Sequence, residues 1–252
     1  MQVLKPATIA QRIGNQINTA MIAMTTFFEP NEFRILRWSD ELNQLMKANA
    51  MEAYRWQAIL HHMTGNVGGM ELSMQNASRL GLQPSDFSGN LLIGYANLTM
   101  ATKALPHYQS GIDVKYGNIS GGLSTGLAVG LFQRANELLE QLGLAALSAP
   151  KEVNMDKVKL AAQVLRSQGV TDELCATVVD AAGEVLRERK LFWLDQSPEY
   201  FVNDMSCTVG LQYRVSVNHS EAALMTMQTA EKLIERNLDT LPFYVTFLGA
   251  SS

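Results

Sequence analysis

Charged side chains are scarce in this chain of 252 residues. It carries 20 Lys and Arg and 24 Asp and Glu, so 17% of its residues are charged, against roughly 25% in an ordinary soluble protein. The net charge of −4 argues against a dedicated nucleic-acid binder, because such a protein normally presents a basic face. A surface this poor in charge makes a free monomer less soluble, so we expect a stable protein partner or self-association.

Cysteine and long apolar runs are lacking too. Cys175 and Cys207 are too few for a disulfide framework or a cysteine-based zinc site. No run of 18 apolar residues occurs, which predicts that no helix spans a membrane. Residues 1–6 lack the charged head and apolar run of a secretion signal. We therefore expect a cytoplasmic location, or a place in a larger particle.

The sequence also lacks the signatures of common active sites. Its histidines do not show the spacing of a metal-binding helix, which predicts solvent-facing or capping roles for them: His61, His62, His107 and His219. The glycine-rich segment 117–126 lacks the Gly-Lys-Ser/Thr ending of a phosphate loop, and no predicted strand precedes it. We expect no catalytic residue, no metal and no cofactor, so a non-enzymatic role is favoured.

Helical periodicity dominates the chain up to about residue 195. Apolar residues spaced by three and four predict a helix over 7–26, and Asn31 is the expected N-cap of the next one. The same spacing predicts a helix over 155–167, which Gly169 ends. Thr171 then caps another helix, whose first turn is acidic and whose end is basic, as the helix dipole favours.

A period of 34 residues runs through the region from Met51 to Pro150. Frames that start at 51, 85 and 119 place Ala58, Leu92 and Gly126 at position 8, where packed helices need a small residue. Position 27 holds Ala77, Gly111 and Ala145, and Gly65-Asn66 marks the turn in the first frame. The pattern resembles the tetratricopeptide repeat, a helix-turn-helix unit of 34 residues. Leu92, Pro106 within the second frame, and Gln133 at the third turn depart from that pattern, so an irregular helical bundle is the alternative.

The middle of the chain is nearly neutral. Residues 86–136 hold five charged side chains, which indicates either a central core or a surface that a partner covers. The sequence leaves both alternatives open.

The last fifty residues change period. Apolar and polar residues alternate over 207–217, which predicts a half-buried strand with the Cys207 thiol buried on its apolar face. Ser220 is the expected N-cap of a helix that ends at residue 236, and 243–248 forms a second strand. The apolar face of that helix is expected to comprise Ala223, Leu224, Met227, Ala230, Leu233 and Ile234. Since two strands alone are marginal, a third is expected from 200–205 or from another subunit.

These patterns predict a mainly α protein of helical hairpins or an irregular bundle, with a small C-terminal strand-helix-strand element. We expect a helical hairpin region over 1–150, a helical hairpin over 151–198 and the α/β element over 199–252.

Three functions fit such a chain. The first is a non-enzymatic interaction or assembly component, either an adaptor or a subunit of a larger complex. A structural subunit of a virus particle or secretion apparatus is an alternative, in which strand 207–217 or 243–248 pairs across subunits. A small-ligand sensor or enzyme with a pocket near the C-terminal element is another. The candidate ligand-binding residues are Tyr213, Arg214, His219 and Ser220. The candidate interface residues are Phe192, Trp193, Met225, Met227, Phe243 and Tyr244.

Overall fold

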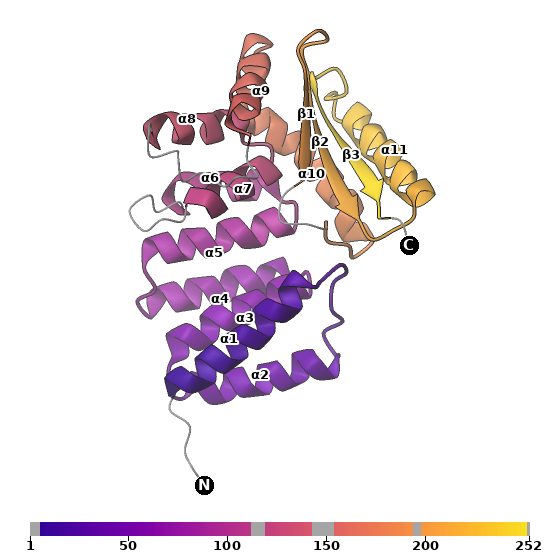
Figure 1. The fold of residues 1–252 in the computed structure, drawn as a ribbon. Helices are drawn as coiled ribbons and strands as arrows, with labels where there is room; N and C mark the ends of the chain where they lie inside the picture. The colour runs from indigo at the N-terminus through magenta and orange to yellow at the C-terminus, as the bar shows by residue number, and fades with distance from the viewer. Residues whose placement is uncertain (1–5, 112–118, 143–153, 194–197, 251–252) are drawn as a thin grey trace.

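A computed structural model describes residues 6–111, 119–142, 154–193 and 198–250 of the chain. Within these ranges the fold is mainly α, with eleven helices and a small three-stranded sheet near the C-terminus (Figure 1). This confirms the predicted fold class.

The helices are α1 (Pro6–Ile22), α2 (Phe33–Met46), α3 (Ala50–Met63), α4 (Val67–Arg79), α5 (Pro84–Asn97), α6 (Ala101–Gly111), α7 (Ile119–Ala128), α8 (Phe132–Leu142), α9 (Met155–Ser167), α10 (Asp172–Glu188) and α11 (His219–Glu235). The strands are β1 (Glu199–Asn203), β2 (Thr208–Val215) and β3 (Phe243–Gly249).

The first three helices share a core of their own. Ile13 and Ile17 of α1, Trp38 of α2 and Trp56 of α3 are buried in it. A Cβ at Gly14 would meet the Trp56 ring, so the glycine lets α1 approach α3 closely. The helix predicted over 7–26 ends at Ile22, and α2 begins after Glu32 rather than after a side-chain cap by Asn31.

Neighbouring helices then pack as successive pairs, α3 with α4, α5 with α6 and α7 with α8 (Figure 1). The first helices of these pairs begin at Ala50, Pro84 and Ile119, 34 and 35 residues apart. The predicted turn at Gly65-Asn66 is confirmed, since Gly65 has a φ of +70° and the Asn66 side chain accepts from the N–H of Gly69 at 2.9 Å. A bundle of packed helix pairs is thus present. Position 27 of the third frame, Ala145, and the closing Pro150 lie outside the described residues.

The neutral stretch contributes to the core. Its buried side chains include Leu92, Tyr95, Leu123 and Phe132, and they belong to one cluster that runs from Ala58 to Phe247. This cluster draws on all three of the segments expected from the sequence, so the helix pairs, helices α9 and α10 and the sheet pack together around it. Of the two alternatives, the described residues of 86–136 therefore favour the central core.

Helices α9 and α10 form where the sequence predicts them, but α9 packs against α8 and β2, whereas α10 packs against α6, α11 and β3 rather than against α9. Asn154 caps α9, and the Thr171 hydroxyl accepts from the N–H of Leu174 at the start of α10.

The sheet has the strand order β1-β2-β3, with β1 antiparallel and β3 parallel to β2. The third strand that a stable sheet needs comes from within the chain. Val209, Leu211, Tyr213 and Val215 of β2 are buried, so the predicted alternation is confirmed. Helix α11 connects the parallel strands β2 and β3 and packs against both β3 and α10 (Figure 1).

Two local predictions in this region are wrong. Cys207 precedes β2 in a turn with a φ of +51°, and it is only partly buried, so its thiol is not a core group. The N-cap of α11 is Asn218, whose side chain accepts from the N–H of Glu221 at 2.9 Å, whereas Ser220 lies inside the helix. An Asx side chain at this position caps as well as a serine would, and it comes earlier in the chain.

Among the described residues, no helix is long and apolar enough to cross a membrane.

Candidate interaction surface

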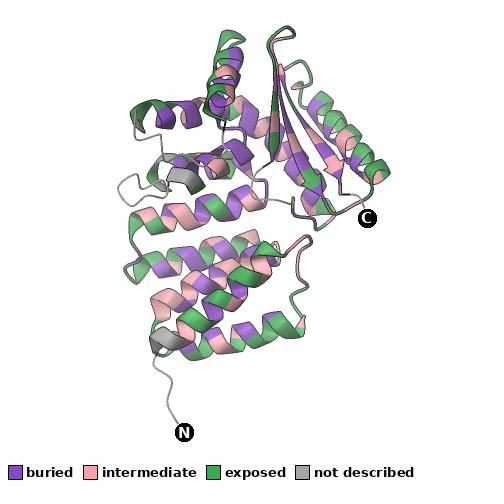
Figure 2. Ribbon diagram, in the orientation of Figure 1, coloured by how far each residue is buried: buried purple, intermediate pink, exposed green. Residues whose placement is uncertain are grey.

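Helix α11 places an apolar stripe on the outside of the molecule. Ala223, Met227, Ala230 and Ile234 are spaced by four, three and four residues, so they share one helix face. All four are exposed, with Met227 at 61% and Ile234 at 59%. Figure 2 shows exposed residues along the outer side of this helix. We call these four residues the α11 outer stripe.

The predicted orientation of α11 is therefore wrong. The helix turns a different set of residues toward β3 and α10: Ala222, Met225, Thr229 and Leu233. Of the residues expected inside, only Leu233 is buried, while Leu224 is 44% exposed. Ala222, Met225 and Leu233 of this inner set belong to the core cluster, whereas the α11 outer stripe is left uncovered.

Charged residues of α11 bond to the neighbouring helix rather than to the stripe. Glu221 accepts from Arg189 at 2.9 Å, Lys232 donates to Glu188 at 2.9 Å, and Arg236 just past the helix donates to Glu184 at 2.6 Å. Burial raises the pKa of Glu184, but Arg236 and Lys232 outweigh it and hold that pKa below its usual range. These ion pairs join the side of α11 that faces α10 to that helix and its end.

The open edge of the sheet is partly covered by the same helix. The backbone N–H of Phe247 in β3 donates to the Thr226 hydroxyl of α11 at 3.0 Å. This N–H already has an acceptor within the chain. It is therefore not available to pair with a strand of another subunit at this position.

The outer face of the sheet carries two exposed aromatic residues. Phe201 of β1, Gly210 of β2 and Tyr244 of β3 lie in one cross-strand row. A Cβ at Gly210 would come within 2.5 Å of the Tyr244 ring, so this ring lies against the glycine. Phe201 and Tyr244 are 42% and 43% exposed.

The candidate ligand-binding residues do not gather around one pocket. Tyr213 is fully buried, and its hydroxyl donates to the carbonyl oxygen of Ala128 at 2.5 Å. Its neighbour Arg214 points to the opposite face of β2, where a guanidinium nitrogen lies 3.9 Å from a Glu199 carboxylate oxygen. His219 and Ser220 are exposed in the first turn of α11.

The candidate interface residues divide between core and surface. Phe192 is buried against Phe27, with ring centroids 4.6 Å apart, and Trp193 lies partly buried against Tyr213. Met225 and Phe243 are buried as well, while Met227 and Tyr244 are exposed. Met225 and Met227 thus occupy opposite faces of α11, as their spacing requires.

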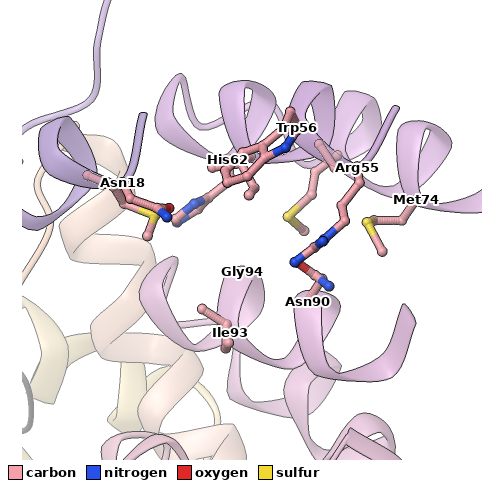
Figure 3. A pocket seen from close by; sticks show the side chains of 12 residues that line it. Asn18, Arg55, Trp56, His62, Met74, Asn90, Ile93 and Gly94 are labelled. Carbon is pink, nitrogen blue, oxygen red and sulfur yellow. The ribbon is translucent and has the colours of Figure 1, made fainter. Parts of the chain in front are cut away.

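A second feature is a cavity of about 170 Å³ between α1, α3, α4 and α5 (Figure 3). His62 of α3 lines it and is only 3% exposed, so the expected solvent-facing or capping role is wrong for this histidine. Burial lowers the pKa of His62 to about 4, which keeps its imidazole neutral at pH 7. Sequence reasoning missed this site because its residues come from four helices and form no motif.

The chain matches no model of a known protein family, no curated protein and no solved structure in the comparisons made with it.

Proposed function

We propose that the chain is a protein-interaction and assembly component that associates with a second copy of itself through the α11 outer stripe. The observation that carries this proposal is the exposure of all four apolar residues of the α11 outer stripe. Solvent-exposed apolar faces of this kind mark contact surfaces, because leaving them in water costs free energy that burial recovers.

The order of side chains along the stripe supports a second copy as the partner. Small and large residues alternate as Ala223, Met227, Ala230 and Ile234. In an antiparallel pair of α11 helices about a twofold axis, Ala223 of each copy faces Ile234 of the other, and Met227 faces Ala230. Each large side chain then meets a small one, which is the self-complementarity that a twofold interface requires.

The remainder of the fold supports the same role. Helix pairs that begin 34 and 35 residues apart resemble tetratricopeptide repeats, a scaffold for protein contacts, although Pro106 within α6 departs from that pattern. The proposal places the assembly in the cytoplasm, where Cys175 and Cys207 remain reduced, and both are free thiols here.

Light scattering after size exclusion tests the proposal over a range of concentrations. A single helix pair buries less area than a large permanent interface, so we expect the mass to rise with concentration from 27.8 kDa toward twice that value. Met227→Glu should keep the protein monomeric. Leu72→Glu, at a residue of α4 that is 56% exposed, is the matched control and should leave the mass unchanged. A wild-type chain that stays monomeric throughout, or a Met227→Glu variant that still dimerises, contradicts the proposal.

Cross-linking tests the antiparallel arrangement. Each variant carries one introduced cysteine, Ala223→Cys or Ile234→Cys, in a Cys207→Ser background. A mixture of the two should form a disulfide-linked dimer under mild oxidation, whereas neither variant alone should do so. Linkage of Ala223→Cys to itself would indicate a parallel pair and overturn the proposed geometry.

A further inference from the structure

We propose that the cavity between α1, α3, α4 and α5 is a binding site for a small organic carboxylate with a compact apolar body. The site is independent of the α11 outer stripe. Its size fits such a ligand, because an apolar cavity of about 150 Å³ is enough to hold benzene and this one is about 170 Å³.

The cavity has an exposed mouth and a buried floor. Asn18 of α1 and Ile93 of α5 are exposed at its rim, whereas His62, Met70 and Met74 are buried. Figure 3 shows the imidazole of His62 pointing toward Asn18 and the side chain of Arg55 reaching from α3 toward Asn90 on α5. Polar groups from three helices therefore meet around an otherwise apolar space.

The apolar lining can adapt to a ligand. Three methionines contribute to it, and their flexible thioethers fit themselves around apolar groups of different shape: Met21, Met70 and Met74. Gly94 lets the Met70 thioether lie directly against α5, since a Cβ at this position would come within 2.6 Å of the Met70 sulfur.

Two buried nitrogen atoms at the site have no hydrogen-bond partner within the described residues. They are Nε of Arg55 and Nε2 of His62. A buried polar atom without a partner costs free energy, and a ligand that supplies the partner recovers it. Few such atoms occur in a folded protein, so two on one helix beside one cavity point to a ligand.

Arg55 determines the charge of the ligand. Its closest carboxylate, Glu52, lies 3.4 Å from Nη1 and already accepts a shorter bond of 2.9 Å from the Trp56 indole. Glu52 takes up only Nη1, which donates to both of its oxygens at 3.4 and 3.5 Å, and Nε remains to donate to a carboxylate of the ligand. His62 is neutral, so it adds a hydrogen bond to a second polar atom of the ligand without adding charge.

Benzoate is the probe that tests this site, and benzamide is its neutral counterpart of the same shape. We expect saturable binding of one benzoate per chain by calorimetry, with a shift of the Trp56 indole N–H signal in NMR spectra. Benzamide should bind about tenfold more weakly or worse, since it lacks the charge that the guanidinium recognises.

Variants locate the site. Arg55→Met should weaken benzoate binding about tenfold or more, and Arg55→Lys should fall between it and the wild type. Arg79→Met, at an exposed arginine of α4, is the control and should bind as the wild type does. Circular dichroism establishes that each variant is folded. Met227→Glu, monomeric under the assembly proposal, should also bind benzoate normally, which separates the two proposals.

Three results would overturn the inference. One is an absence of saturable benzoate binding up to its solubility limit, which would mean that the cavity holds only water. Another is equal affinity for benzoate and benzamide. The third is a folded Arg55→Met variant that binds benzoate as tightly as Arg79→Met does.

Discussion

The carboxylate of Asp172, at the start of α10, caps α8 by accepting the backbone N–H of Gln133 at 3.0 Å. Its other oxygen accepts the N–H of Arg134 at 2.9 Å, so one side chain satisfies two of the donors that the first turn of α8 leaves open. Asp172 is only 3% exposed. A side chain from the start of α10 thus caps α8, a helix that lies earlier in the chain.

Removal of this cap should destabilise the protein. Asp172→Ala leaves two buried N–H groups without an acceptor, so we expect the free energy of unfolding to fall by about 2 kcal/mol or more. Glu173→Ala, at the exposed carboxylate next to it, should cost less than about 1 kcal/mol, since surface ion pairs contribute little. Urea denaturation followed by circular dichroism measures both. If the two variants lost equal unfolding free energy, the Asp172 cap would contribute no more to stability than the surface carboxylate of Glu173.

Stability should decrease in acid because of His62. Its pKa is near 4 in the folded chain and 6.5 ordinarily, so the unfolded chain binds a proton that the folded chain resists. This contribution is fully present above pH 6.5 and is lost as the pH falls toward 4, by about 3 kcal/mol in total. The difference in unfolding free energy between wild type and His62→Gln should change with pH by this amount. The exposed His219→Gln serves as the control, and a difference that does not vary with pH for His62→Gln would refute the expectation.

Gly183 is the contact point between α10 and the turn that joins α5 to α6. A Cβ at this glycine would collide with the carbonyl oxygen of Thr99, which is backbone and cannot move aside like a side chain. Thr99 itself has a φ of +51°, and Arg187 donates to its carbonyl at 2.8 Å. Gly183→Ala should therefore lower the unfolding free energy by about 3 kcal/mol.

The matched control for Gly183 is another helical glycine, Gly68 of α4, which is exposed and where a Cβ would meet only the Asn66 side-chain oxygen at 4.0 Å. Gly68→Ala should raise the unfolding free energy by about 0.5 kcal/mol, because alanine restricts the unfolded chain. Thermal and urea unfolding give both values. If Gly183→Ala and Gly68→Ala changed the unfolding free energy equally, the backbone at Thr99 would have moved aside without cost to make room for the new methyl group.

Tyr213 should behave as a core residue. Tyr213→Phe removes the hydrogen bond to the Ala128 carbonyl and leaves that buried oxygen short of a donor, which should cost about 1–2 kcal/mol. Tyr244→Phe, on the exposed face of the sheet, should stay within about 0.5 kcal/mol of wild type. If Tyr213→Phe left the unfolding free energy unchanged, the hydrogen bond from the Tyr213 hydroxyl to Ala128 would not help to hold α7 on the sheet.

Local signals in the sequence predicted much of the fold. The Gly65-Asn66 turn and the Thr171 cap are formed within a few residues, so their chemistry is visible in the order of amino acids. Strand β2 follows from strict alternation for the same reason. The 34-residue frame also anticipated where the first helices of the pairs begin, because each pair is one local hairpin.

The sites depend on contacts between distant segments, and the sequence could not predict them. The cap that Asp172 provides to α8 and the cavity that Arg55 and His62 line each require helices to meet that are far apart in the chain. A histidine pair without metal-ligand spacing gave no signal that one member would be buried.

Helix α11 shows where sequence information ends. Periodicity determined that Ala223, Met227, Ala230 and Ile234 share one face, because 3.6 residues make a turn. It did not determine which face would be covered. That depended on the tertiary fit, in which Met225 and Thr229 are buried where α11 packs against β3 and α10. The sequence by itself determined the stripe, and only the packing of α11 on α10 and β3 decided that it lies on the outside of the molecule.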